Sequence, residues 1–199
     1  MRVIIITGTP GTGKTTISRK ISKNINAEVI SLNILALEED YILGTDSERE
    51  TSIIKQDKII DHVLNLIQDR KQKSLNFLII EGHFADIIPT HLIDQAIVLR
   101  CNPDELRRRL ITRGYKKKKV MENIQSEILG NCVNFFINKH PEIPLLEIDT
   151  SQFEIDTVVE IITEIITESI DLRKYRVGKI DWLEKLSKED RIFEFFDKT

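Results

Sequence analysis

The sequence predicts an α/β fold in which a five-stranded parallel sheet carries helices on both faces. Short apolar runs alternate along the chain with stretches of helical periodicity, which is typical of strand–helix–strand units in a parallel sheet. The 199 residues suffice for one domain of ordinary size. Their hydrophobic content of 41% and charged content of 31% are those of a globular protein. The expected strands are residues 3–7, 28–31, 77–81, 96–100 and 145–149.

The first strand leads directly into a glycine-rich loop. Residues 3–6 form a β-branched run, as expected of a strand buried on both faces. The letters GTPGTGKT follow at 8–15 and match the phosphate-binding pattern G-x-x-x-x-G-K-T. Its glycines let backbone N–H groups approach phosphate oxygens, Lys14 can reach the β- and γ-phosphates, and the Thr15 hydroxyl is suited to bind Mg²⁺. The chain is therefore expected to be a P-loop nucleotide-binding protein.

Apolar periodicity predicts two helices in the first half of the chain. Residues 14–25 carry isoleucines at spacing four, so a helix should begin at or near Gly13. Residues 57–67 likewise place their apolar side chains on one face. The segment 38–51 between them is acidic and is expected to be irregular.

Three further helices are expected in the second half. Pro103 is tolerated at the first position of a helix and opens the first of them, which ends at Gly114. The second should run from near 118 to about 139, where the letters HP end it. The third should cover 155–170, because glutamates at spacing four favour a helix over a strand in this isoleucine-rich segment.

Residues 171–199 differ in composition from the core expected over 1–170. A charged, loop-like stretch leads into aromatic-rich amphipathic segments. Such a tail more often packs on its own domain, but it can also serve as a peptide-like element for a partner or for dimerisation. The sequence leaves the oligomeric state open.

Charge and cysteine usage restrict the class of protein. A net charge of −3 argues against a generally basic, nucleic-acid-coating surface. Cys101 and Cys132 are expected to be packing residues of a reducing compartment rather than a disulfide framework. The N-terminal apolar run ends in the phosphate loop, unlike a signal peptide, and no apolar stretch approaches the ~20 residues that span a bilayer. We expect a cytoplasmic protein, or a nuclear one in a eukaryote, without a membrane partner.

Two side chains at the end of the third strand are candidates for chemistry. Glu81 ends this strand at the sheet edge where ligands of open α/β folds bind, and a carboxylate there commonly holds Mg²⁺ through water. A charge at the end of an apolar strand needs a partner or an ion, which favours a functional reading. His83 lies two residues further on, and on position alone it is more readily explained as a loop histidine bonded to backbone.

An arginine-rich helix supplies candidate cations. Arg109 and Arg113 are four residues apart and fall on one helical face. Guanidinium groups stabilise a phosphoryl group in transfer because they contact two oxygens at once. Arg107 and Arg108 are expected on a solvated face. The lysines at 116–119 are either solvated surface or a patch that attracts nucleotide or RNA phosphate.

Together these segments resemble the adenylate kinase isoenzyme 6 family, the nuclear and archaeal group of adenylate kinase-like ATPases linked to small-subunit ribosome assembly. The resemblance covers residues 1 to about 150. The phosphate loop is generic, whereas RGY followed by ENI-x-x-EI is specific. The matching letters are GTPGTGKT at 8–15, EGH at 81–83, VLR at 98–100, RLITRGY at 109–115 and ENIQSEI at 122–128.

The resemblance implies a nucleoside-monophosphate-kinase core, with a monophosphate-binding segment at about 33–57 and a lid at about 113–119. It implies phosphoryl transfer from ATP to AMP or another nucleoside monophosphate, a separate ATPase activity, Mg²⁺, and a small-subunit ribosomal protein of the platform, possibly with rRNA, as partner. The metal would be held by Thr15 and Glu81. The expected catalytic residues are Lys14, Glu81, His83, Arg109 and Arg113. The expected nucleotide-binding residues are Gly8, Pro10, Gly11, Thr12, Gly13, Lys14, Thr15, Thr16 and Arg109.

Two positions depart from the family pattern. The third strand of relatives often ends in D-x-H, and Glu81 keeps the acid with one more methylene, so the match favours a functional His83. Relatives often read LAREE in the monophosphate segment, where the arginine grips the AMP phosphate, but this chain has Leu37 in its place. The sequence therefore leaves three alternatives open: an AMP kinase with ATPase activity, a nucleotide-switched assembly factor with little kinase activity, and a small-molecule kinase of another P-loop subfamily.

Overall fold

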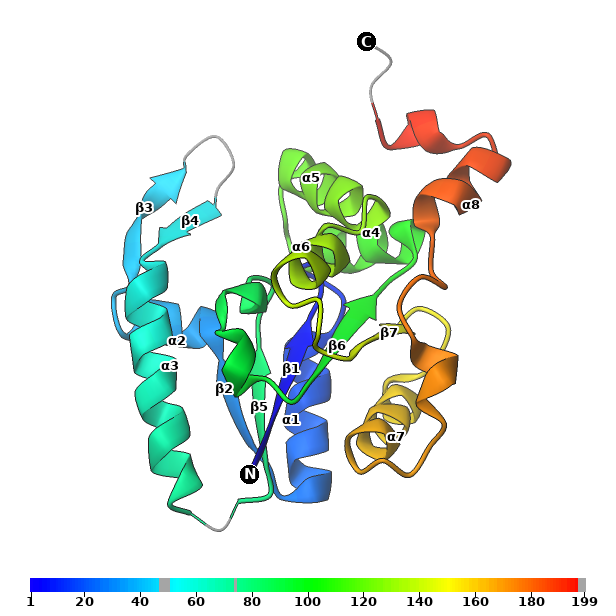
Figure 1. Ribbon diagram of the computed structural model, residues 1–199. Coiled ribbons are helices and arrows are strands. Elements are labelled where there is room, and N and C mark those ends of the chain that lie inside the picture. Colours follow the sequence, from blue (N-terminus) through cyan, green and yellow to red (C-terminus); the bar gives the residue numbers. More distant parts are fainter. Residues whose placement is uncertain (47–50, 74, 197–199) are drawn as a thin grey trace.

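Five parallel strands form the sheet that the sequence predicts. The structure, a computed structural model, describes residues 1–46, 51–73 and 75–196. The strand order is β2-β5-β1-β6-β7, with all neighbours parallel, so β1 lies at the centre (Figure 1). The strands are β1 (Arg2–Thr7), β2 (Glu28–Ser31), β5 (Phe77–Glu81), β6 (Gln95–Arg100) and β7 (Leu145–Asp149).

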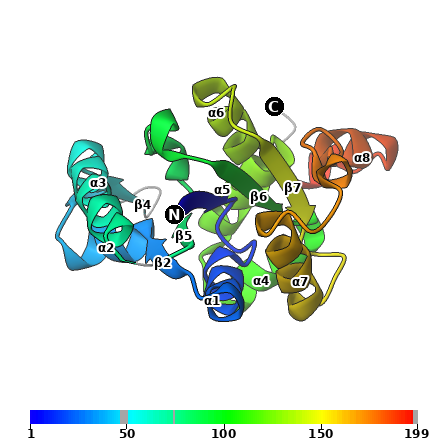
Figure 2. The ribbon, with the colours of Figure 1, turned by 60° about the horizontal axis from the view of Figure 1, so that its bottom comes forward.

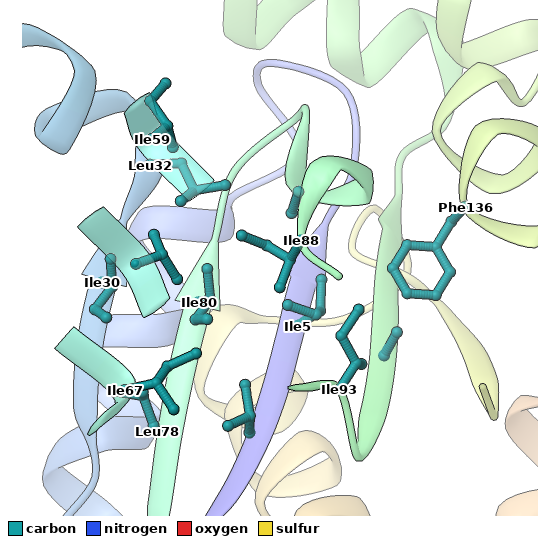
Figure 3. Packing of buried hydrophobic residues seen from close by; sticks show 14 of the residues in the cluster. Ile5, Ile30, Leu32, Ile59, Ile67, Leu78, Ile80, Ile88, Ile93 and Phe136 are labelled. Carbon is teal, nitrogen blue, oxygen red and sulfur yellow. The ribbon is translucent and has the colours of Figure 1, made fainter. Parts of the chain in front are cut away.

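Helices cover both faces of this sheet. Side chains of β1 alternate between the faces, with Ile4 and Ile6 on one side and Val3 and Ile5 on the other. The first face packs on α1 (Lys14–Ile25) and α7 (Ile155–Ile166), which lie side by side (Figure 2). The second face packs on other helices, and Figure 3 shows Ile5 and Ile80 of the sheet beside this layer. Its helices are α2 (Leu32–Glu38), α3 (Gln56–Lys71) and α6 (Asn131–Lys139).

A third apolar cluster lies beyond the carboxyl ends of the strands. It joins α4 (Pro103–Thr112), α5 (Lys117–Ile128) and α8 (Trp182–Lys188). Trp182, Leu186 and Phe195 contribute the buried side chains of the C-terminal tail. The described part of the tail thus packs on its own domain, the commoner of the two outcomes considered.

The helix expected over 118–139 is two helices, so that prediction was wrong. Helix α5 ends at Ile128 and α6 begins at Asn131. Between them Gly130 has φ 64°, a left-handed conformation that ends a helix and that glycine adopts without steric cost. The break turns α6 back towards the sheet, where Val133 and Phe136 are buried.

The segment expected to be irregular also contains regular structure. Strands β3 (Ile42–Asp46) and β4 (Thr51–Ile54) pair antiparallel in a separate two-stranded sheet, and α2 precedes them without having been anticipated. Residues 47–50 of this segment lie outside the described residues. Helix α7 ends at Ile166, four residues before the expected 170, and Glu168 beyond it has φ 58°.

Both cysteines are free thiols, as expected, and burial raises the pKa of Cys101 to about 12. Within the described parts of the chain, no helix has the length and apolar content needed to cross a bilayer.

Candidate nucleotide-binding and phosphoryl-transfer site

The phosphate loop connects β1 to α1 at the carboxyl edge of the sheet. Two of its glycines cannot be replaced without displacing neighbours. A Cβ on Gly8, which has φ 140°, would lie 2.4 Å from the Leu99 carbonyl oxygen. A Cβ on Gly11, with φ 99°, would lie 2.7 Å from the Leu106 side chain. The loop therefore fits between β6 and α4 only in this glycine-rich form.

Lys14 begins α1 and folds back over the loop. Its side chain is buried, and Nζ donates to the carbonyl oxygens of Gly8 at 2.7 Å and Thr9 at 3.1 Å. Burial lowers the pKa of this ammonium group. These two backbone carbonyls take two of the three ammonium donors, which leaves the third for a phosphate oxygen.

Glu81 and Thr15 form the pair that the sequence assigned to Mg²⁺. The Thr15 hydroxyl donates to Glu81 Oε1 at 3.0 Å. The other carboxylate oxygen, Oε2, is buried and has no hydrogen-bond partner among the described residues. An unpartnered buried carboxylate oxygen beside the phosphate loop fits a hydrated cation. No group of three or more His, Cys, Asp or Glu side chains in the described part of the chain could hold a metal, so most ligands of a cation here would be water and phosphate.

His83 lies on the wall of this site, two residues beyond Glu81. Its exposed ring packs edge-on against Phe84, with ring centroids 4.9 Å apart. The surrounding cleft walls and the nearby Lys14 ammonium lower the pKa of His83 to about 4. The imidazole is therefore neutral near pH 7 and can accept a hydrogen bond.

These residues meet in a small cleft of about 100 Å³, here called the central cleft. Arg113 and Tyr115 enter it from the segment after α4, opposite the phosphate loop. The expected lid thus begins as a loop over the central cleft, whereas Lys117 to Lys119 already belong to the first turn of α5. The residues lining the central cleft are Pro10, Gly11, Gly13, Lys14, Thr15, Thr16, Asn33, His83, Arg113 and Tyr115.

A second cleft of about 610 Å³, the α7-side cleft, opens between α4 and the loop from β7 to α7. Arg109 forms its wall and is held in place: Nε donates to Glu105 Oε1 at 2.8 Å, Nη1 to Thr150 Oγ1 at 3.0 Å, and Nη2 to the Thr150 carbonyl at 2.8 Å. Hydrogen bonding to Arg108 lowers the pKa of Glu105 to about 2, so this carboxylate stays charged. Gln152 and Phe153 line the same cleft.

A third cleft of about 630 Å³, the α2-side cleft, opens on the opposite side of the central cleft. It is walled by α2, the start of α3, α5 and α6. From the expected monophosphate-binding segment at about 33–57, the residues that line it are Asn33, Ala36, Leu37, Ile42, Ile54 and Gln56. Leu37 lines it with 65% of its surface exposed. Phe84 and Phe135 add aromatic surface, and Asn123 adds an amide.

The structure brings most of the predicted residues together. His83, Arg113 and most of the predicted phosphate-loop residues line the central cleft, and Glu81 accepts a hydrogen bond from Thr15 there. Thr12 and Arg109 line the α7-side cleft instead, and Gly8 lines neither of these two clefts. Sequence reasoning missed Thr150 and Glu105, which hold Arg109. A threonine directly after the fifth strand was the available signal, because ligands bind beyond the carboxyl ends of such strands. It also missed Phe135, because one continuous helix was expected over 118–139 and the break at Gly130, which directs α6 towards the α2-side cleft, was not foreseen.

The fold and site define a P-loop protein of the kinase type. A shikimate kinase from Bacteroides thetaiotaomicron superposes with a TM-score of 0.54 at 20% identity, covering 83% of this chain and 98% of that one. A deoxyadenosine kinase from M. mycoides with bound dATP superposes with a TM-score of 0.53 at 16% identity, covering 84% and 100%. At these identities the likeness concerns the fold alone.

Sequence comparison goes further. The family described as "AAA domain" matches residues 4–130. A "Putative adenylate kinase" of Methanocaldococcus jannaschii is 37% identical over 185 residues, covering 92% of this chain and 93% of the relative. A protein of the same description from Pyrococcus abyssi is 32% identical over 182 residues, covering 92% of each chain. The chain therefore belongs to the adenylate kinase-like family of P-loop proteins.

Proposed function

We propose that the protein transfers the γ-phosphoryl group of ATP to AMP, forming two molecules of ADP, and hydrolyses ATP when no monophosphate is bound. The observation that carries this proposal is the continuity of three clefts. Gly13 and Arg113 line both the central and the α7-side cleft, whereas His83 and Tyr115 line both the central and the α2-side cleft. Two nucleotides bound in the outer clefts would therefore meet at the phosphate loop.

ATP, the donor, is assigned to the α7-side cleft. The guanidinium plane of Arg109, fixed by Glu105 and Thr150, offers a stacking surface for a base. Gln152 can hydrogen-bond a base edge from the same cleft. From there the triphosphate would reach the backbone N–H groups of the phosphate loop and the start of α1, where the helix dipole favours an anion.

Phosphoryl transfer needs charge stabilisation more than covalent chemistry, because the transition state is loose and its charge is spread over oxygens. Lys14 would contact the β- and γ-phosphates from one side and Arg113 the transferred group from the other. Thr15 and Glu81 are the residues that would hold Mg²⁺, with Glu81 acting through water. The bound cation supplies further neutralisation of phosphate charge.

The acceptor is assigned to the α2-side cleft, next to His83. AMP brings its own phosphate nucleophile, so it needs positioning only. Water needs a group that orients it, and the neutral imidazole of His83 can accept a hydrogen bond from it. His83 is thus assigned to hydrolysis more than to transfer.

A second candidate function is a nucleotide-switched assembly factor in which hydrolysis resets the protein and AMP is a poor acceptor. Leu37 favours it: this exposed apolar side chain lines the α2-side cleft where relatives often carry a phosphate-gripping arginine. The resemblance of ENIQSEI and RGY to the isoenzyme 6 family extends this candidate to a role in small ribosomal subunit maturation, with a platform ribosomal protein and rRNA as partners.

The test compares ADP formation from MgATP alone with that from MgATP plus AMP. The AMP kinase predicts a rate that rises severalfold or more with AMP and two ADP formed for each ATP consumed. A rate unaffected by AMP, with one ADP and one phosphate per ATP, would instead support the switched assembly factor. Replacing AMP by CMP, UMP or shikimate in the same assay separates this function from those of other P-loop kinases.

A further inference from the structure

The C-terminal tail is joined to the phosphate loop by a buried network of charged side chains. Its centre is Glu127 in the last turn of α5, whose side chain is 2% exposed. Glu127 Oε2 accepts a hydrogen bond from the Thr9 hydroxyl at 2.6 Å. Oε1 accepts from Arg100 Nε at 2.7 Å, from the Cys101 amide at 3.1 Å and from Trp182 Nε1 at 3.2 Å. One carboxylate therefore connects the phosphate loop, the end of β6 and the tail.

The tail makes two further polar contacts to the same network. Arg100 Nη1 donates to Glu147 Oε2 and to the Ile180 carbonyl, each at 3.3 Å. Glu147 Oε1 in turn accepts from the backbone amides of Lys179 at 2.6 Å and Ile180 at 2.8 Å. The tail's backbone and its Trp182 side chain thus complete the hydrogen bonding of two buried carboxylates and one buried guanidinium.

These contacts matter because a buried charged side chain keeps a single conformation only if all its hydrogen bonds are satisfied. Without residues 179–182, Glu147 would lose two donors, Glu127 would lose the indole and Arg100 would lose an acceptor. Water would enter, and the Glu127 carboxylate would gain rotamer freedom.

Thr9 transmits the position of Glu127 to the reacting phosphates. Its hydroxyl is fixed by Glu127, while its carbonyl oxygen accepts hydrogen bonds from Lys14 Nζ and from Thr12 Oγ1 at 2.9 Å. Because Lys14 Nζ donates to the Thr9 carbonyl oxygen, the position of the Thr9 backbone helps to determine the position of the Lys14 ammonium group. A displacement of about 1 Å at such a group is enough to lower a rate by about 10²-fold.

We propose that Glu127 and Trp182 are positioning residues for phosphoryl transfer, and that the C-terminal tail acts as an internal positioning element for the phosphate loop. Neither residue touches the substrates; they act through Thr9 and Lys14. The kinetic part of this inference rests on the proposed function, whereas the coupling between tail and loop does not.

The kinetic test uses the full chain with Glu127→Gln, Trp182→Phe and the matched control Leu186→Ala. Trp182→Phe keeps an aromatic side chain but removes the N–H donor, and Leu186 is a packing residue of the same helix and the same apolar cluster. We expect Glu127→Gln to lower kcat by about tenfold or more, Trp182→Phe to lower it severalfold, and the KM for MgATP to change by less than about threefold in both. Leu186→Ala should lower Tm and leave kcat of the folded protein unchanged.

Two outcomes would overturn the inference. The first is a wild-type kcat in Trp182→Phe, and the second is an equal loss of kcat in Leu186→Ala and Trp182→Phe when each is assayed at the same interval below its own Tm. If Glu127→Gln does not fold, the comparison of the other two variants decides. The fluorescence emission of Trp182, the single tryptophan of the chain, gives a measurement that does not depend on turnover. Saturating MgATP should shift this emission in wild type but not in Thr9→Val. An unchanged wild-type spectrum with bound MgATP would contradict the coupling even where transfer to AMP is absent and the proposed function has failed.

Discussion

The α7-side and α2-side clefts are similar in size but are built very differently. The first is lined by the phosphate loop, by the loop that follows β7 and by Arg109, whose side chain donates three hydrogen bonds to Glu105 and Thr150. The second is lined by exposed apolar groups, among them Leu37 at 65% and Phe135 at 56% exposure, on α2 and α6. Polar contacts therefore fix the geometry of the α7-side cleft, whereas exposed apolar side chains leave the α2-side cleft adaptable.

This contrast divides the chemistry in two. Changes at the phosphate loop and its α7 side should affect every reaction of ATP. Changes on the α2 side should alter the acceptor and leave activation of ATP intact.

The largest effect is expected for Lys14→Ala. It removes the ammonium group proposed to contact the phosphates while removing little packing, so transfer to AMP and hydrolysis should both fall by roughly 10³-fold. Steady-state assays of both reactions, with circular dichroism to verify folding, measure this. Lys23→Ala, which changes an exposed lysine of the same helix, is the control and should match wild type. Near-wild-type hydrolysis by Lys14→Ala would refute the P-loop assignment.

The next effect concerns the two arginines. Arg113→Ala is expected to lower kcat by on the order of 10²-fold with a smaller change in KM, because its guanidinium would stabilise charge in the transition state. Arg109→Ala removes the proposed stacking surface for the base and should mainly raise the KM for ATP. Arg19→Ala is the control, since Arg19 is an exposed arginine of α1 that lines none of the three clefts. Arg109 lines the α7-side cleft and not the central cleft, so a loss of kcat as large as that of Arg113→Ala would contradict its assignment to the base. An effect of Arg113→Ala confined to the KM for ATP would mean that Arg113 only holds the donor.

The same contrast explains how far the sequence predicts the site. The phosphate loop, Glu81 and the five strands of the parallel sheet could be predicted, because a buried parallel strand leaves a continuous apolar run and the loop needs glycine at fixed positions. The α2-side cleft could not be predicted from such patterns in the sequence. The β3–β4 hairpin shows only weak alternation of polar and apolar residues along the sequence, and the break between α5 and α6 depends on the single residue Gly130. The residues that line the cleft also come from segments far apart in the chain.

Leu37→Arg should act on the α2 side alone. If the segment is aligned with the family as proposed, the new guanidinium forms a charge-assisted contact worth roughly 1.5–3 kcal/mol with the AMP phosphate. The KM for AMP should therefore drop by about tenfold or more, with hydrolysis of ATP alone unchanged. Leu43→Arg, at an exposed leucine of β3 outside the residues that line the cleft, is the control. An unchanged KM for AMP would show that the alignment or the site is wrong.

A smaller effect is expected on stability as a function of pH. The pKa of His83 is lowered from 6.5 to about 4, first because the surrounding cleft walls desolvate its charged form and then because Lys14 repels that charge. Asp86 acts in the opposite direction, and Lys119 acts in the same direction as Lys14. Between these values the unfolded chain binds a proton that the folded protein does not, so stability falls as the pH drops from about 6.5 to about 4. Thermal unfolding should show wild type losing more Tm than His83→Asn over this range. Parallel losses in the two proteins would contradict the lowered pKa.

The division between the two sides is tested most directly by the ratio of phosphoryl transfer to hydrolysis in Glu81→Ala and His83→Ala. Glu81 pairs with Thr15 at the phosphate loop, so its loss should lower both activities by a similar factor and leave the ratio near that of wild type. His83 lies where the central and α2-side clefts meet, and its loss should lower hydrolysis more than transfer to AMP, raising the ratio. A proportional fall of both activities in His83→Ala would leave that residue with a structural role only. It would contradict the account that the two sides of the site act separately.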